Sequence, residues 1–428
     1  VVNVANETSF LISGVCTIGD GLVTVSVAGA SPPSTVTACS SGSWLTSGMD
    51  LSGIADGSNV IIVDASQTDF YGNTGNAATV SLDKDATPPG TPTVNALATS
   101  DTTPVVTGTA DAGAVVEVSV GGAQYTVTAN GSGQWSLDTG TATPVGGAFN
   151  PIIDGTNEVT AVVTDPAGNS STDVTSDELI IDTIDPVAPT VTLQLTNDTT
   201  PTIAGTAEAG TSNTITFGGA TFTVVADGFS LWSLDTGTVP PDSGTFSPDL
   251  NGVNDVAVIS TDVAGNSAVD ATINEVTIDT TEPAVSITGA PAATSVTETA
   301  YTVSGTCQSA DGSVTTGIVG ASPATRTVSC IADTWSALFD VSAVPDGDDA
   351  LRIDARQTDP AGNTGSTSQL SDKDTRPPLI AITNDGSGGD EFVNEQEESA
   401  VVVSGTSDAI DGQIVTVTFS DGANPGVI

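Results

Sequence analysis

The sequence predicts an all-β chain of tandem seven-strand β-sandwich domains, and three observations lead to that prediction. Val, Ile and Thr are abundant, whereas Leu, Lys and Glu, which favour helices, are scarce. Apolar and polar residues alternate in short runs, as in residues 23–27. One Trp recurs in each of four segments that are on the order of 100 residues long. Many short strands follow from these features.

The four segments carry the same elements in the same order. A small residue followed by Gly comes first, then the Trp, then an Asp-Gly or Asn-Gly turn and an alternating strand. A hairpin turn with the pattern Thr-Asp-x-x-Gly-Asn, a last strand and an acidic junction containing Pro close each segment. The Trp residues are Trp44, Trp135, Trp232 and Trp335, and the hairpin turns begin at Thr68, Thr164, Thr261 and Thr358. This spacing favours immunoglobulin-like sandwiches over propeller blades or solenoid coils, with each Trp packed between two sheets.

The acidic junctions predict the domain boundaries. They divide the chain into immunoglobulin-like domains at 1–86, 87–185, 186–282 and 283–376, followed by a partial domain at 377–428. The first domain lacks the strand that residues 284–287 supply in the fourth, and the fifth stops after about three strands. We therefore interpret the sequence as a window on a longer polypeptide. If it were complete, neighbouring chains would have to pair with its open ends.

Cysteine divides the repeats into two kinds. Cys16 and Cys39 lie in the first repeat and Cys307 and Cys330 in the fourth, at identical separation, whereas the second and third repeats have none. No Cys-x-x-Cys pattern or His accompanies them, which favours a disulfide within each repeat and an oxidising compartment. Buried free thiols are the alternative.

The charge balance excludes most chemistry. The chain has 52 Asp plus Glu, 6 Lys plus Arg, no His and a formal net charge of -46. Without His there is no Ser-His-Asp or Cys-His nucleophile, and the acidic surface repels nucleic acid and anionic membranes. Glycoside hydrolysis needs only paired carboxylates, but the acids here fall in turns and junctions. We therefore predict that the chain is not an enzyme. It also lacks an apolar stretch of about 18 residues that could span a membrane.

The acids themselves predict a Ca²⁺ site at each junction. In an immunoglobulin-like sandwich the junction, the B–C loop and the F–G turn meet where the domain begins, and oxygen ligands without thiolate or imidazole select a hard cation. The predicted ligands, junction by junction, are Asp83, Asp85, Asp111, Asp165 and Asn169; Asp182, Asp185, Glu208, Asp262 and Asn266; Asp279, Glu282, Asp311, Asp359 and Asn363; and Asp372, Asp374, Asp408 and Asp411.

Simple turns and solvated linker charge are the alternative explanation for any single one of these residues. Turn formation is also our interpretation of a second acidic set, which we place in the E–F loops at the opposite end of each sandwich. That set is Asp56, Asp154, Asp249 and Asp346.

The combined motifs resemble a known family. The Gly-Thr-Ala or Gly-Thr-Cys step, the Trp, the Thr-Asp-Pro-Ala-Gly-Asn turn and the Asp-Thr-x-x-Pro-Pro junction are similar to the tandem bacterial immunoglobulin-like repeats of large surface adhesins and biofilm-associated proteins. The resemblance implies a long extracellular stalk with Ca²⁺ at its junctions, on the residues given above, and a ligand-binding module elsewhere in the chain. The cysteines depart from adhesins exported in one step from the cytoplasm, and indicate passage through an oxidising periplasm.

The predicted function is therefore structural: a Ca²⁺-rigidified, extended rod at the bacterial cell surface that spaces or supports adhesion, or part of an extracellular fibre. Its partners would be neighbouring repeats of the same longer chain or identical chains, with a cell-surface or matrix ligand as a further candidate. The alternatives are an adhesin module that binds glycan or host protein directly, and a subunit of a self-assembling filament.

Overall fold

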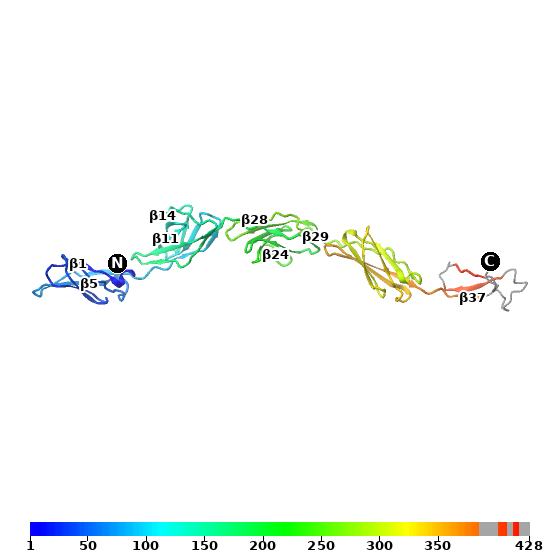
Figure 1. Ribbon diagram of the computed structural model, residues 1–428, viewed down its shortest axis with the longest axis horizontal. Helices are drawn as coiled ribbons and strands as arrows, with labels where there is room; N and C mark the ends of the chain where they lie inside the picture. Colours follow the sequence, from blue (N-terminus) through cyan, green and yellow to red (C-terminus); the bar gives the residue numbers. More distant parts are fainter. Residues whose placement is uncertain (385–400, 409–413, 419–428) are drawn as a thin grey trace. The chain divides into compact units, whose positions relative to one another are not determined.

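The computed structural model describes residues 1–384, 401–408 and 414–418, and it is nearly all β, as the sequence predicts. Its helical segments are three short 3-10 turns, Glu7–Ser9, Glu298–Ala300 and Ser309–Asp311. No helix in this described part is long and apolar enough to cross a membrane. Strands that are close in sequence stay together, so that β1 and β5 share the blue body of Figure 1 and β11 and β14 share the cyan one.

The chain forms two compact units. One contains Val1–Thr192, Thr202–Ser247 and Asp255–Glu275, and the other contains Leu193–Pro201, Pro248–Asn254 and Val276–Ile428. The sequence of the third repeat is shared between them.

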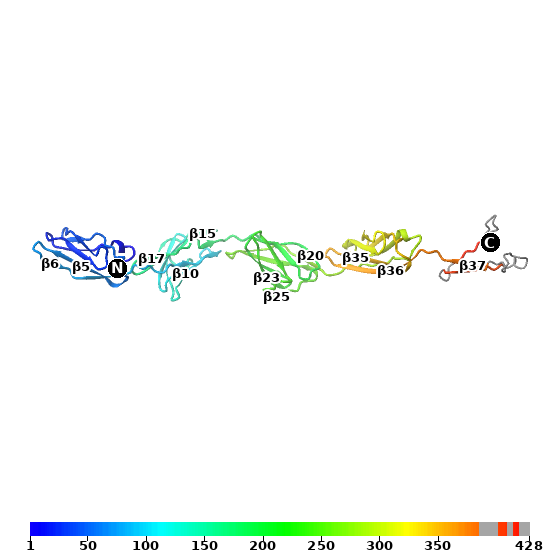
Figure 2. The same ribbon diagram turned by 90° about the horizontal axis from the view of Figure 1, so that it is seen from below.

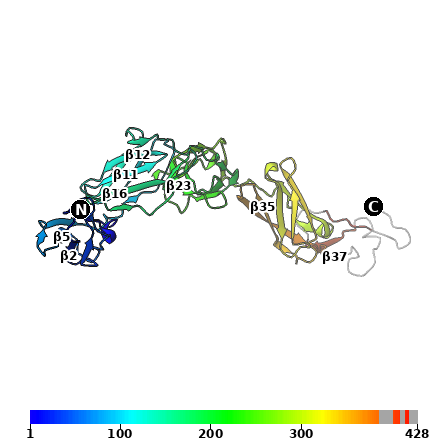
Figure 3. The ribbon, with the colours of Figure 1, turned by 60° about the vertical axis from the view of Figure 1, so that its left-hand side comes forward.

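The second repeat shows the sandwich most completely. Its larger sheet has the order β14-β12-β11-β16-β17, and two three-stranded sheets, β13-β10-β8 and β15-β18-β9, complete the repeat. Figure 3 shows β12, β11 and β16 in this order. The strands are β8 (Thr93–Val94), β9 (Leu97–Thr99), β10 (Val105–Thr109), β11 (Val115–Val120), β12 (Ala123–Thr128), β13 (Gln134–Asp138), β14 (Gly146–Gly147), β15 (Gly155–Asn157), β16 (Val159–Thr164), β17 (Ser170–Thr172) and β18 (Leu179–Ile181).

The third repeat uses the same strands, each about 97 residues further along the chain. In the first unit they form the sheets β19-β21-β24 and β25-β23-β22-β27-β28, and in the second unit the sheet β20-β29-β26. The strands are β19 (Thr190–Val191), β20 (Gln194–Thr196), β21 (Thr202–Thr206), β22 (Ser212–Phe217), β23 (Ala220–Val225), β24 (Leu231–Asp235), β25 (Ser243–Gly244), β26 (Asn251–Asn254), β27 (Val256–Thr261), β28 (Ser267–Val269) and β29 (Val276–Asp279).

The first repeat has a two-stranded sheet, β1-β4, and a larger sheet, β3-β2-β5-β6, in which β7 also pairs with β5. The strands are β1 (Ser13–Val15), β2 (Val23–Val27), β3 (Ser34–Thr37), β4 (Ser43–Leu45), β5 (Gly57–Thr68), β6 (Thr74–Asn76) and β7 (Val80–Lys84). Val2 forms a parallel bridge with Lys84, just as Ala293 pairs with Lys373 in the fourth repeat. These pairs align residue 1 with residue 292, in agreement with the prediction that the first domain lacks the strand that residues 284–287 supply in the fourth.

The fourth repeat has the sheets β30-β36-β35-β32-β33 and β31-β34, with β35 and β36 side by side in Figure 2. Its strands are β30 (Ala293–Thr294), β31 (Tyr301–Thr306), β32 (Ser313–Ile318), β33 (Thr325–Ser329), β34 (Thr334–Phe339), β35 (Gly347–Thr358) and β36 (Thr364–Asp374).

In the partial fifth repeat, β37 (Ile380–Asn384) pairs with β38 (Ser404–Ser407). From its apolar runs, the sequence predicts strands at 400–404 and 414–419 in this repeat. The first of these instead begins at Ser404, and no strand is formed in residues 414–418.

A contact between Trp and Gly explains the most regular sequence motif. The four Trp side chains are at most 8% exposed, and each stands opposite the Gly of the neighbouring strand, as Trp135 does opposite Gly108. A Cβ on Gly108 would lie 2.5 Å from the Trp135 ring. Each indole N–H donates to a main-chain carbonyl, which satisfies the one polar atom that would otherwise be buried. The predicted role of Trp as a core residue is confirmed.

Candidate functional site: the junctions between repeats

The F–G hairpin turn is held by its own Asp side chain. Asp165 accepts hydrogen bonds from the main-chain N–H of Asn169 at 2.9 Å and from its side-chain amide at 2.8 Å. The hydrogen bond from the Asn169 side chain is the main cause that lowers the pKa of Asp165 below its ordinary value. Gly168 has a φ of 92°, where other residues are strained. The same bonds recur at Asp69, Asp262 and Asp359, so the Thr-Asp-x-x-Gly-Asn pattern specifies one rigid turn.

The Asn of this turn binds the end of the preceding repeat. The side-chain amide of Asn169 donates to the carbonyl of Asp85 at 2.8 Å, and Asn266 and Asn363 make the equivalent bonds to Asp182 and Asp279 at 2.9 and 2.7 Å. In all three cases the partners are 84 residues apart. Asn169 is fully buried, and its side-chain oxygen also accepts from the N–H of Val4. We call this contact the Asn latch.

A second contact runs the other way at each junction. The carbonyl of the Ala in the turn accepts a hydrogen bond from a loop of the preceding repeat: Ala167 from the Asn3 side chain, Ala264 from the N–H of Ser100, and Ala361 from the N–H of Asn197. Each turn is therefore bound to the preceding repeat at two points.

The B–C loops supply the acids that hold the entering chain. Asp111 accepts from the N–H of Gly90 at 2.9 Å, and Glu208 accepts from the N–H of Val187 at 3.1 Å. In the fourth repeat this position belongs to Gln308, which accepts from Ala284, and in the fifth to Asp408, which accepts from Leu379. The sequence alignment of Asp311 with Asp111 thus missed Gln308, because a 3-10 turn lengthens this loop.

Asp311 instead meets other acids. Burial raises the pKa of Asp311 above its ordinary value, and the charges of Asp359 and Asp279 raise it further. The structure therefore brings three of the acids predicted for this junction close enough to repel one another.

The junction acids themselves form local turns. The carboxylates of Asp85, Asp182, Asp279 and Asp374 each accept from the N–H two residues later. Asp83 and Asp372 face the preceding repeat instead, where they accept from the N–H groups of Asn59 and Asp349. Asp185 and Glu282 are exposed beside the junction prolines. Asp411 lies outside the described residues.

The E–F loops also reach the junctions, which corrects our interpretation of the second acidic set. Asp56 accepts from the hydroxyl of Thr87, Asp154 from the N–H and hydroxyl of Thr183, and Asp346 from those of Thr375. In the third repeat Asn251 does this for Thr280, in place of the predicted Asp249. The E–F loop lies at the opposite end of the sandwich from the B–C loop. Strand G ends beside the E–F loop, and the junction to the next repeat begins there.

The fit of these groups to a Ca²⁺ ion is mixed. Hard oxygen donors gather at every junction, and no His or Lys competes for them between residues 87 and 282. Within the described ranges, however, no three His, Cys, Asp or Glu side chains are close enough together to hold a metal ion. Each ion would need main-chain carbonyls and water beside one or two carboxylates, a ligand set that Ca²⁺ accepts.

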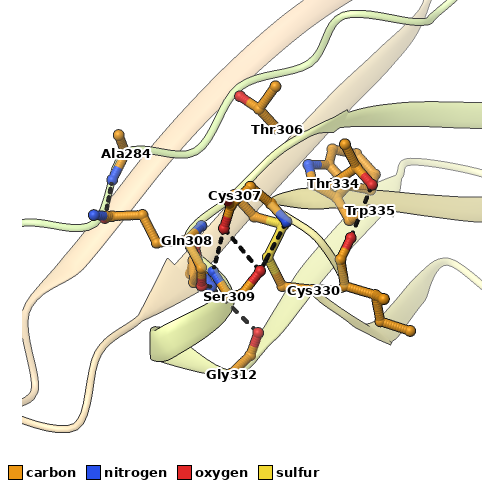
Figure 4. The surroundings of a disulfide bond; sticks show 12 residues. Ala284, Thr306, Cys307, Gln308, Ser309, Gly312, Cys330, Thr334 and Trp335 are labelled. Carbon is orange, nitrogen blue, oxygen red and sulfur yellow. Dashed lines mark hydrogen bonds between the residues drawn. A yellow bond between two sulfur atoms is a disulfide. The ribbon is translucent and has the colours of Figure 1, made fainter.

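Both predicted disulfides are present in the structure. Cys16 bonds to Cys39 and Cys307 to Cys330, each across a sequence separation of 23. Figure 4 shows Cys307 at the end of β31 and next to Gln308, with Trp335 nearby. The side chain of Gln357 accepts from the N–H of Gln308 and donates to its carbonyl and to that of Gly312, so the disulfide and one Gln fix the B–C loop.

One family comparison gives a match. Residues 90–183 match the family model of the bacterial Ig-like domain. The second repeat is therefore similar to a bacterial Ig-like domain. Asp111, Asp165 and Asn169 lie within the matched residues, and the third repeat has the same strands in the same register. A search of curated proteins found no match.

Three solved structures are similar to the chain. A Ca²⁺-stabilised adhesin with which an Antarctic bacterium binds ice is 25% identical over 87% of this chain and 96% of its own, with a TM-score of 0.30. A tetra-tandem repeat from the extending region of a large adhesion protein is 22% identical over 87% and 97%, with a TM-score of 0.25. A 1.5-MDa bacterial ice-binding adhesin is 21% identical over 68% and 100%, with a TM-score of 0.28. TM-scores this low support no argument about function.

Proposed function

We propose that the chain is a segment of a bacterial extracellular stalk or fibre, in which Ca²⁺ at the junctions stiffens a row of Ig-like domains. The repeated Asn latch is the observation that carries this proposal. A binding module needs one distinctive surface, whereas this chain makes the same contact at three successive junctions. A regular spacing of domains is what such a contact provides.

The proposed division of labour at a junction follows from its chemistry. The Asn latch and the B–C acid fix where the next domain begins, and the domain boundaries fall at 86, 185, 282 and 376. Ca²⁺, when bound, neutralises carboxylates that would otherwise repel. At the junction between the second and third repeats it would be held by Asp182, Asp185, Glu208 and Asp262, with Asn266 keeping the turn in place.

The compartment follows from the disulfides. Two bonds closed within small domains are typical of proteins that mature in an oxidising environment, and disulfides are rare in the cytosol. We therefore place the mature protein outside the cell, at the bacterial surface.

Small-angle scattering of the whole chain in Ca²⁺ and in EDTA tests the proposal. We expect a larger maximum dimension in Ca²⁺, and equal dimensions would refute a structural role for the ion. Asp182→Asn with Asp185→Asn should loosen only one junction and give a partial loss of extension. The matched control is Asp235→Asn with Asp242→Asn, which removes the same charge from the third repeat without touching the predicted ligands, and it should extend normally.

A further inference from the structure

The second and third repeats contain an acidic loop that lies away from the Asn latch. It follows β17 at residues 173–178 and follows β28 at residues 270–275. In the fourth repeat this loop is missing, because β36 runs unbroken from Thr364 to Asp374 and pairs with β35. The first repeat has a break at the equivalent place, residues 77–79, but no acid in it. The acidic loop therefore belongs only to the repeats without Cys.

The loop uses carboxylates where a strand would otherwise supply carbonyls. Glu178 accepts from the N–H of Val159 at 3.2 Å, and Asp173 accepts from the N–H of Ala161 at 2.7 Å. N–H groups two residues apart on a strand point to the same edge, so the two carboxylates lie along one edge of β16.

The third repeat repeats the arrangement. Glu275 accepts from Val256 at 3.0 Å and Asp270 from Val258 at 3.0 Å. Burial raises the pKa of Asp270, and the charges of Glu275 and Asp255 raise it further, so these acids are close enough to interact.

Each loop also leaves one buried oxygen without a partner. Glu178 is 5% exposed and Glu275 is 1% exposed, yet Oε1 of both side chains makes no hydrogen bond. Only one other buried side-chain atom in the described residues shares this condition. A buried acceptor without a partner costs about 1–3 kcal/mol, and more when it is charged. The same orphaned oxygen at equivalent positions in two repeats indicates a partner that comes from solution.

The chain cannot supply that partner itself. All six Lys and Arg residues lie outside residues 87–282, so no cationic side chain belongs to these repeats. A water molecule could donate to this oxygen, but only a cation would also offset the charge of the buried carboxylate.

We propose that Glu178 and Glu275 each bind one Ca²⁺ ion inside the domain, with Asp173 or Asp270 as the neighbouring carboxylate. Main-chain carbonyls and water complete the six to eight oxygen ligands that Ca²⁺ takes. These two ions stabilise the edge of β16 and β27 and do not depend on the junction ions.

Counting the Ca²⁺ ions bound by the whole chain, by equilibrium dialysis, tests the proposal. Glu178→Gln should lose one ion and Glu178→Gln with Glu275→Gln should lose two. Glu117→Gln, an exposed change on β11 of the same repeat, is the matched control and should lose none. Asp182→Asn with Asp185→Asn should keep both ions, so failure of the junction proposal and failure of this one give different results. An unchanged ion count in the double Gln variant overturns the inference.

Hydrogen exchange of the unmodified chain gives an independent readout that does not require a variant to fold. In Ca²⁺ the N–H groups of Val159, Ala161, Val256 and Val258 should exchange more slowly than in EDTA, and Mg²⁺ at the same concentration should have a smaller effect. Equal protection with and without Ca²⁺ contradicts the proposal.

Discussion

The first and fourth repeats bury a charge in a different way from the second and third. At the end of strand G, Lys84 is 4% exposed, and its Nζ lies 2.9 Å from Glu7 and 3.3 Å from Asp56. Lys373 is equally buried and pairs with Glu298 at 2.9 Å. The equivalent residues of the second and third repeats are Ile181 and Ile278, both fully buried.

The two kinds of repeat share one fold but accommodate a buried charge differently. The repeats with Cys carry a buried cation with acids around it, and a disulfide that joins the start of the B–C loop to the segment that follows the next two strands. The repeats without Cys have an apolar strand end and a buried Glu whose counter-ion must come from solution. The buried Lys of the repeats with Cys is paired within the protein. The buried Glu of the repeats without Cys depends, in our proposal, on Ca²⁺ from solution. Four measurements test this difference between the two kinds of repeat.

Removing a disulfide should have the largest effect. Cys307→Ser with Cys330→Ser releases a loop with a sequence separation of 23 and should destabilise the fourth repeat by about 3 kcal/mol. Hydrogen exchange resolved by repeat should show faster opening there, with the second and third repeats unchanged. Equal loss in all repeats would mean that the domains do not unfold independently.

Removing the buried cation should come next. Lys373→Met leaves Glu298 without its cation and removes one of the two cations beside Asp346, which keeps Arg376. It should cost the fourth repeat about 2 kcal/mol, below the 3–5 kcal/mol of fully buried pairs because both acids are partly exposed. Arg352→Met on the same repeat is the control. Its ion pair with Asp354 is exposed and should contribute less than about 0.5 kcal/mol. Similar losses in chemical denaturation would contradict the assigned role of Lys373.

Removing one Asn latch should have a smaller effect on the second repeat itself. Asn169→Ala deletes the bonds to Asp85 and Val4 and should cost about 1–2 kcal/mol. Limited proteolysis at the first junction should accelerate, while the junctions held by Asn266 and Asn363 keep their resistance. Asn130→Ala, in a turn within the same repeat, should leave the first junction intact.

Raising the pH should have the smallest effect of the four, because it leaves the stability of the first repeat unchanged near neutrality. Burial lowers the pKa of Lys84, but hydrogen bonds to Glu7 and Asp56 outweigh it, so the pKa is raised above 10.5. The resulting stabilisation is complete below the unfolded pKa and is lost as pH rises through the folded one. The protection factors of the first repeat should therefore fall above about pH 10.5. The third repeat has no Lys, Tyr or Cys and serves as the control. An equal loss of protection in the first and third repeats would exclude the deprotonation of Lys84 as the cause.

Much of the architecture could be read from local patterns. We could predict the Trp residues of the core, the F–G turn and the disulfide pairs, because each depends on residues whose spacing repeats along the chain. A repeated spacing is visible in the sequence without the structure. The lysines show the limit of this reading. In the sequence they stand within the acidic junctions, but the structure buries both, because strand G places them inward against the acids of distant loops.

Local sequence patterns were enough to predict the all-β class, the repeat order, the two kinds of repeat and the acids at the start of each domain. Which loops meet depended on the tertiary fold. Asp56 and Asp154 lie at the following junction. Gln308, not Asp311, accepts the hydrogen bond from the entering chain, and Oε1 of Glu178 is buried without a partner. Local periodicity fixes strands and turns, whereas the burial and pairing of a side chain depend on segments up to 165 residues away.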